Sequence, residues 1–228
     1  MDLFLEFGPP NCGKGRLQKI LCATFGFIPL SVGDVCREQK RQNSDIWQAA
    51  REDMAATGST LWSTEILMKA MNLPFERAVQ QGTVAFDGWL RDKQQIRPLI
   101  SWALGHNIDR IIIIDFLVTD DLCMKRAGER GREDDVDIHT RLRDFHRDSE
   151  PALSEFLGYE DVLNFDRITF ETEKAEEDEV GYYRDFVTAI GLLRGFKMVC
   201  NSSDYNVLNS CLRQAFDSER KPPALVTA

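Results

Sequence analysis

A strand, a glycine-rich loop with a lysine and a helix follow one another at the start of this chain. Residues 2–7 read DLFLEF and predict a short buried strand, and residues 17–23 predict a helix. Between them lies GPPNCGKG, in which Gly8, Gly13 and Lys14 match the pattern G-x-x-x-x-G-K. Glycines allow a tight backbone path that turns successive N–H groups inward, where they and the helix N-terminus attract an anionic phosphate. The sequence therefore predicts a phosphate-binding loop.

Composition limits the class of protein. The chain has 228 residues, of which 43% are apolar, enough for one α/β domain with a sizeable core. Its net charge is −9 and its pI is about 4.9, so we expect no nucleic-acid partner, because duplex binding needs a basic face. Six cysteines are scattered without C-x-x-C spacing, which favours a reducing compartment over a disulfide framework or a zinc site.

The pattern of apolar residues also bears on location. The start of the chain lacks a basic segment followed by an apolar run, so no signal peptide is predicted. The longest apolar stretch, within residues 110–118, is too short to span a membrane. We therefore expect a cytoplasmic protein with no membrane partner.

Continuous apolar runs that alternate with helical stretches predict a parallel sheet. The runs that mark five buried strands are Leu3–Phe7, Phe27–Leu30, Thr83–Phe86, Ile111–Val118 and Phe196–Cys200. The predicted helices cover roughly residues 14–25, 34–42, 44–57, 63–81, 93–104, 120–130, 137–147 and 204–217. The expected fold class is α/β, a five-stranded parallel sheet flanked by helices, with ligands at the carboxyl ends of the strands.

Residues 159–195 interrupt this alternation. They contain an acidic block, Glu171–Glu179, which is typical of a solvated helix face or a mobile loop. The helical pattern of Tyr182–Leu193 follows and is expected to pack on the body of the protein. We interpret the segment as an insertion before the last strand, not as a separate domain.

Four further motifs follow the glycine-rich loop. They are Ser31–Arg37 after the second predicted strand, Asp87–Arg91 with Gln95 after the third, Arg126 with Arg130 after the fourth, and Arg132–Asp135 leading into Arg141. Together and in this order, the five motifs resemble the adenylate kinase and nucleoside monophosphate kinase family. The resemblance covers residues 1–153, resumes weakly at 196–217 and does not extend to 159–195. It implies a P-loop NTPase-like core (1–31, 83–130 and 148–228), a helical lobe that binds the monophosphate (32–82) and a short lid (131–147).

The resemblance implies reversible phosphoryl transfer from ATP to a nucleoside monophosphate, with Mg²⁺ as the cofactor. This reaction needs two polyanions held in line and neutralised, and arginine suits the task because its planar fork binds phosphate bidentately. By resemblance, the ATP site comprises Gly8, Pro10, Asn11, Cys12, Gly13, Lys14, Gly15, Arg16 and Arg126. The monophosphate site comprises Ser31, Val32, Gly33, Arg37, Gly88, Arg91 and Gln95. Catalysis would rest on Lys14, Arg91, Arg130, Arg132 and Arg141, and Asp87 would hold waters on Mg²⁺.

The lid is expected to be short. Only Gly131 to Asp135 separate Arg130 from Val136, and no cysteine occurs among them. A structural zinc site is therefore not expected. Short-lid members of the family are typically monomers, so the resemblance implies a monomer.

The acceptor base is indicated by two residues that disagree. Gln95 stands where adenine-accepting relatives use glutamine, which favours AMP. Val32 stands where AMP-specific relatives carry threonine, and valine offers no hydroxyl. We expect AMP as the acceptor, with UMP or CMP as the alternative.

Three residues depart from the family pattern. Arg16 replaces a threonine or serine whose hydroxyl helps to position Mg²⁺, so it either adds charge at the phosphates or points away from them. Trp89 and Leu90 replace the phenylalanine and proline that precede the acceptor arginine, here Arg91. These departures keep open a different class of function, a nucleotide-binding regulatory protein with weakened catalysis.

Overall fold

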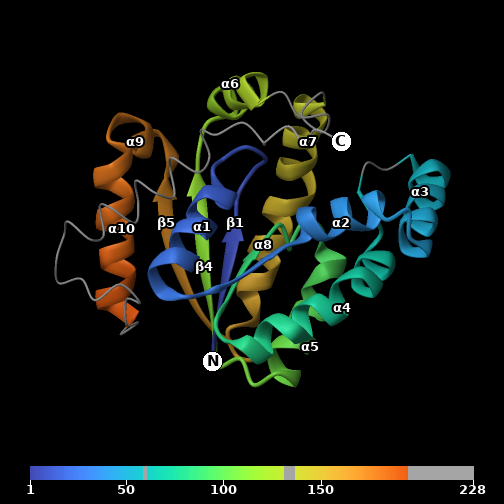
Figure 1. Cartoon of the computed structure of the whole chain (residues 1–228), viewed down its shortest axis with the longest axis horizontal. Coiled ribbons are helices and arrows are strands. Elements are labelled where there is room, and N and C mark those ends of the chain that lie inside the picture. Colours follow the sequence, from blue (N-terminus) through green and yellow to red (C-terminus); the bar gives the residue numbers. More distant parts are fainter. Residues whose placement is uncertain (59–60, 131–136, 195–228) are drawn as a thin grey trace, which may run out of the picture.

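A five-stranded, all-parallel sheet forms the centre of the computed structural model, which describes residues 1–58, 61–130 and 137–194 (Figure 1). In spatial order the strands are β2 (Ile28–Ser31), β3 (Val84–Asp87), β1 (Asp2–Phe7), β4 (Arg110–Leu117) and β5 (Asn164–Glu171). Because β1 is flanked by β3 and β4, the loop that follows β1 leaves the sheet at its centre. The predicted fold class is confirmed.

Helices surround this sheet (Figure 1). Their bounds are α1 Lys14–Phe25, α2 Val32–Arg41, α3 Asp45–Thr57, α4 Thr64–Gln81, α5 Ile96–Gly105, α6 Asp120–Arg130, α7 Ile138–Asp144, α8 Glu150–Phe156, α9 Thr172–Glu177 and α10 Glu179–Arg194. Short turns of other helical types are η1 Lys93–Gln95, η3 Phe145–Ser149 and η4 Leu157–Tyr159. In the described part of the chain, no helix is both long and apolar enough to cross a membrane.

Alternating side chains of β1 divide the core into two halves. Leu5 belongs to one half, together with Phe75 of α4 and Trp102 of α5, whose rings stack 4.5 Å apart. Phe4 belongs to the other half, which includes Leu21 of α1. This second half also contains buried residues of α10, which Figure 1 shows beside β5. The two halves hold β1, and thus the start of the loop after it, rigidly in place.

The edge strand β5 is the main correction to the sequence prediction. We predicted the fifth strand at Phe196–Cys200, which lies outside the described residues, and we predicted no strand at Asn164–Glu171. That second prediction was wrong. Only Phe170 of β5 is buried, and the strand carries exposed Arg167 and Thr169, as an edge strand can. A strand of this kind contains no continuous apolar run, so the apolar pattern does not predict it.

Two helices, α9 and α10, follow β5 within the segment 159–195. Most of the acidic block forms α9, while its first residue ends β5 and its last begins α10, which is the expected helix. Tyr183, Val187 and Ile190 of α10 are buried against the body of the protein, as predicted from the pattern. The helix predicted at 204–217 lies outside the described residues.

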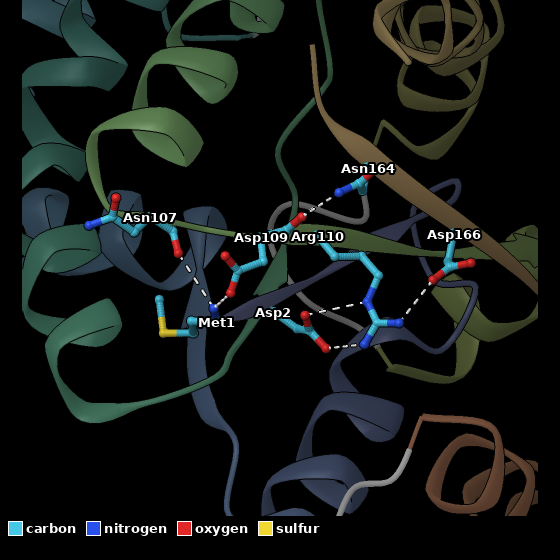
Figure 2. A network of polar contacts seen from close by, with 7 residues as sticks. All are labelled: Met1, Asp2, Asn107, Asp109, Arg110, Asn164 and Asp166. Atoms are coloured by element: carbon cyan, nitrogen blue, oxygen red, sulfur yellow. Dashed lines mark hydrogen bonds and ion pairs between the residues drawn. The ribbon is translucent and has the colours of Figure 1, made fainter. Parts of the chain in front are cut away.

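A polar network joins the amino ends of three strands (Figure 2). Arg110 of β4 donates to the carboxylate of Asp2 in β1 and, at 3.4 Å, to that of Asp166 in β5. Asn164 donates to the backbone oxygen of Asp109 at 3.1 Å. These bonds join β1, β4 and β5 at the end of the sheet opposite to the loop that follows β1.

Candidate functional site

A cleft of about 790 Å³ opens at the carboxyl ends of the central strands. Its walls come from the loop between β1 and α1, the junction of β2 and α2, the segment after β3, and α7 with η3. The predicted residues that line it are Gly8, Pro10, Asn11, Cys12, Gly13, Lys14, Gly15, Arg16, Ser31, Gly33, Arg37, Asp87, Gly88, Arg91 and Arg141. The fold thus brings together residues that lie more than a hundred positions apart in the sequence.

The loop after β1 requires glycine at two positions. A Cβ on Gly8 would lie 2.7 Å from the Cβ of Phe116, so the close approach of these two backbones excludes a larger residue. Gly13 has a φ of 111° and turns the chain into α1. The Nζ of Lys14 donates to the backbone oxygens of Gly8 and Pro9, both at 2.8 Å. The charge of Lys14 is therefore held against the loop that is predicted to bind phosphate.

Two side chains support this loop from outside the cleft. Arg126 of α6 donates to the backbone oxygens of Asn11 at 3.3 Å and Cys12 at 3.1 Å. Thr172, at the start of α9, donates to the same oxygen of Cys12 at 3.1 Å. Arg126 does not line the cleft. Thr172 was not predicted, because a threonine in an acidic block carries no distinguishing signal in the sequence.

Besides Arg16 of α1, three arginines from separate segments line the cleft: Arg37 of α2, Arg91 after β3 and Arg141 of α7. The Nε of Arg91 donates to the backbone oxygen of Gly88 at 2.9 Å. Burial lowers the pKa of Arg91, Asp87 opposes this effect, and the positive charges of Arg141 and Arg37 lower the pKa further. Cations held this close repel one another, and an anion bound among them relieves the repulsion. This part of the cleft is therefore suited to a phosphate group.

Two carboxylates lie side by side at the base of the cleft. Glu6 of β1 and Asp87 of β3 are partners in the register of the two strands, and both line the cleft. The hydroxyl of Ser31 lies 3.4 Å from Oδ2 of Asp87. Burial raises the pKa of Glu6 well above its ordinary value, the charge of Asp87 adds to the rise, and Lys14 opposes it. Glu6 was not among the predicted site residues, although a glutamate inside an apolar strand is a visible signal in the sequence.

Known proteins resemble this chain over the region that builds the cleft. The family model described as an AAA domain matches residues 7–143, more than half of the chain. An adenylate kinase from Maricaulis maris (strain MCS10) is 30% identical over 156 residues, which cover 66% of this chain and 82% of the relative. An adenylate kinase from Hyphomonas neptunium (strain ATCC 15444) is 32% identical over 161 residues, which cover 67% of this chain and 82% of the relative. One from Corynebacterium urealyticum (strain ATCC 43042 / DSM 7109) is 27% identical over 161 residues, covering 70% and 87%.

The chain belongs to the adenylate kinase family. Arg16 lines the cleft and is one of the residues that depart from the expected family pattern. Its guanidinium forms an ion pair with Glu179, the first residue of α10, and the two side chains are 29% and 30% exposed. The segment 159–195 therefore contributes a carboxylate to the edge of the predicted ATP site of this adenylate kinase relative.

Val32 and Gln95 do not line the cleft. Val32 is buried in the core. Gln95 is also buried, and its Oε1 accepts a hydrogen bond from the backbone N–H of Arg91 at 2.9 Å. Gln95 lines a neighbouring pocket of about 490 Å³, which shares Leu61, Arg91 and Asp144 with the cleft. Recognition of adenine by Gln95 stays a prediction.

The turn before Arg91 takes a shape that proline would not adopt. Leu90 has a φ of 60°, in the left-handed region, and is fully buried. The indole N–H of Trp89 donates to the backbone oxygen of Gln95 at 3.0 Å. The two residues that depart from the family pattern are thus integrated into the core.

Two predicted catalytic arginines cannot be placed beside these. Arg130 ends α6, but its side chain lies outside what the structure describes, and so does the whole of Arg132. The lid predicted at 131–147 is described from residue 137 onward.

The base of the cleft fits a magnesium cofactor. Oδ1 of Asp87 is buried and, among the described residues, has no hydrogen-bond partner. Carboxylate oxygens are the ligands that Mg²⁺ prefers, usually one or two of them with phosphate and water. An unpartnered carboxylate oxygen beside the loop that is predicted to bind phosphate meets this requirement.

Proposed function

We propose that this protein transfers a phosphoryl group reversibly from ATP to a nucleoside monophosphate, with AMP as the preferred acceptor (AMP + ATP ⇌ 2 ADP). The observation that carries the proposal is a single cleft in which Lys14 and the glycine-rich loop face Arg37, Arg91 and Arg141. Relatives named adenylate kinase support the general reaction.

On the donor side, the loop N–H groups and Lys14 would bind the β- and γ-phosphates. Lys14 now donates to the backbone oxygens of Gly8 and Pro9. Bound phosphate oxygens would replace these acceptors, so the ammonium group would exchange neutral partners for charged ones. Charge-assisted hydrogen bonds are the stronger kind, so the exchange would favour nucleotide binding.

On the acceptor side, Arg37 and Arg91 would hold the monophosphate, while Arg141 would approach the moving phosphoryl group. No general base is needed, because the attacking phosphate oxygen is already ionised. Alignment of the two nucleotides and neutralisation of charge would lower the barrier. Mg²⁺, held at Asp87, would supply further neutralisation of the donor phosphates. In this proposal α2, α3 and α4 form the lobe that covers the acceptor.

The ion pair between Arg16 and Glu179 favours a second candidate function. An arginine at this position offers no hydroxyl to a metal, and its partner places negative charge near a polyanion. A protein of this kind could bind ATP as a regulator and turn it over slowly. Equilibrium binding of ATP without turnover of any monophosphate would favour this second candidate.

A coupled assay with ATP, Mg²⁺ and each of AMP, UMP, CMP and dCMP tests the acceptor. We expect the highest kcat/KM with AMP, because Gln95 stands at the position where the family resemblance implies recognition of adenine. Discrimination should be loose, since Val32 offers no hydroxyl, and one hydrogen bond typically contributes about 0.5–1.5 kcal/mol. A pyrimidine nucleotide that exceeds AMP by more than about tenfold, or about 1.4 kcal/mol, would contradict this assignment.

A further inference from the structure

Glu6 is a carboxylate without a counterpart at the base of the cleft. Its side chain is 0% exposed, and neither of its oxygens has a hydrogen-bond partner among the described residues. It lines the cleft and lies beside Asp87, whose Oδ1 is also buried and unpartnered. Three carboxylate oxygens therefore gather where water is excluded, and buried groups of this kind need a proton or a bound cation to neutralise them.

Lys14 acts on Glu6 through its charge but makes no direct contact with it. The Nζ of Lys14 donates to Gly8, to Pro9 and, at 3.4 Å, to the sulfur of Cys12, all within its own loop. These contacts use the three N–H groups of the ammonium. In the described part of the chain, no ion pair or hydrogen bond joins Lys14 to Glu6.

Asp115, another buried carboxylate of the same sheet, provides a comparison because its charge is paired within the protein. Asp115 of β4 is 6% exposed, and Arg167 of β5 donates to its Oδ2 through two nitrogens, one of them at 3.1 Å. Asp115 is thus neutralised within the protein. Glu6, which is more deeply buried, is not, so its partner is expected to come from outside the chain.

Position and charge favour a divalent cation as that partner. The phosphate-binding loop ends in Lys14, Gly15 and Arg16, so it lacks the Ser or Thr hydroxyl that commonly holds Mg²⁺ after the lysine. No group of three or more His, Cys, Asp or Glu side chains in residues 1–58, 61–130 and 137–194 is arranged to hold a metal. A cation at this site would depend on two carboxylates together with phosphate oxygens and water, as Mg²⁺ usually does.

We propose that Glu6 and Asp87 together form the protein side of a divalent-cation site at the base of the cleft. Glu6 supplies the oxygen that the loop does not. The remaining ligands are phosphate oxygens of the nucleotide and water, and in this respect the inference rests on the proposed function.

Mn²⁺ provides the probe, because its electron paramagnetic resonance signal reports the free ion directly. Wild type, Glu6→Gln and Asp87→Asn are titrated with Mn²⁺, alone and with saturating ADP. Glu65→Gln, an exposed glutamate of α4, is the matched control. We expect Mn²⁺ affinity to fall by about tenfold or more in Glu6→Gln and in Asp87→Asn, and to stay at the wild-type level in Glu65→Gln. An affinity of Glu6→Gln within about twofold of wild type, or no Mn²⁺ binding by wild type, would overturn the proposal.

The affinity of each protein for ADP in EDTA separates this inference from the proposed function. If ADP binds equally to wild type and Glu6→Gln while Mn²⁺ affinity differs, the cation site is supported. If ADP binds to neither protein, the proposed function fails, and the titration with Mn²⁺ alone still decides the role of Glu6 by the same criterion.

Glu6→Leu keeps the proposal testable should Glu6→Gln fold poorly, because leucine matches the apolar neighbours of β1. In EDTA, Glu6→Leu should melt at a higher temperature than wild type, since a buried unpartnered carboxylate is removed. Adding Mn²⁺ should raise the Tm of wild type and leave that of Glu6→Leu unchanged. An equal rise in both proteins would contradict a cation at Glu6.

Discussion

Arg16 stands between two kinds of anion, the proposed ATP phosphates and the carboxylate of Glu179. The ion pair with Glu179 is about one third exposed, so alone it contributes only about 0–1 kcal/mol to stability. Its effect is on position, because it joins the first turn of α1 to the start of α10. A side chain held in this way adds charge at the edge of the cleft without offering a metal ligand.

Replacing Arg16 with threonine should therefore raise kcat more than it changes KM. The loop N–H groups and Lys14 bind phosphate without Arg16, whereas the restored hydroxyl would act on metal geometry, which matters chiefly in the transition state. Steady-state kinetics at saturating Mg²⁺ measures both constants, with Arg77→Thr on α4 as a control. Lower activity of Arg16→Thr would show that Arg16 is itself a phosphate ligand.

Leu90 gives a prediction that runs against the family pattern. Proline fixes φ near −65°, whereas Leu90 has a φ of 60° and is buried. Leu90→Pro should therefore destabilise this protein by about 3 kcal/mol or more, although the expected family pattern has proline there. Chemical denaturation measures the change, and a variant as stable as wild type would mean that the turn readily adopts the other conformation.

The π-helical turn η3 shapes the cleft at the scale of an element. It lies between α7 and α8, and its two end residues, Phe145 and Ser149, both line the cleft. The hydroxyl of Ser149 donates to the backbone oxygen of Arg91 at 3.2 Å, which links this turn to the arginine cluster. Such turns often occur at functional sites because they redirect side chains within a helix.

A histidine of the same turn should make stability depend on pH. The Nε2 of His146 lies 3.0 Å from Asp120 of α6, and its Nδ1 lies 3.1 Å from Glu150. The hydrogen bond with Asp120 raises the pKa of His146, burial slightly opposes this, and Glu150 adds to the rise. The stabilisation is therefore complete below the unfolded-state pKa of about 6.5 and is lost as pH rises through the folded-state pKa.

His146→Ala should lower Tm at pH 5.5 and change it little at pH 9. The side chain is 44% exposed, so the loss at low pH should stay below about 1 kcal/mol. Thermal melts at the two pH values measure it, with His139→Ala of α7 as a control. An equal loss at both values would show that the ring acts by packing and not by charge.

Elements were predictable from sequence where burial on both faces produced an unbroken apolar run. The helix predicted at 14–25 matches α1, and the strand predicted at 111–118 overlaps β4 closely. β5 was missed because an edge strand alternates polar and apolar residues, and α8 was missed because the pattern changes phase at the π turn. The cleft followed from motifs, but the pairing of Glu6 with Asp87 depends on strand register, which local patterns do not reveal.

At the scale of the whole molecule, the amino ends and the carboxyl ends of the strands differ in how their charges are paired. At the amino ends, Arg110 forms ion pairs with both Asp2 and Asp166 (Figure 2). At the carboxyl ends of the strands, Arg16, Arg37, Arg91 and Arg141 line a cleft beside carboxylate oxygens that are buried without a hydrogen-bond partner among the described residues. Unneutralised groups cost stability and persist where a ligand completes them. The charge pattern of the sheet therefore indicates the carboxyl ends of the strands as the site of function.

Formation of ADP from ATP and AMP, followed by phosphorus NMR for wild type and Lys14→Met, tests the central claim most directly. Removing the charge where the phosphoryl group moves should leave the fold intact and lower the rate by about 100-fold or more. Lys69→Met, an exposed lysine of α4, should keep the wild-type rate. A Lys14→Met protein that retains more than about half of the wild-type rate, or a folded wild type that binds ATP but forms no ADP, would contradict the account.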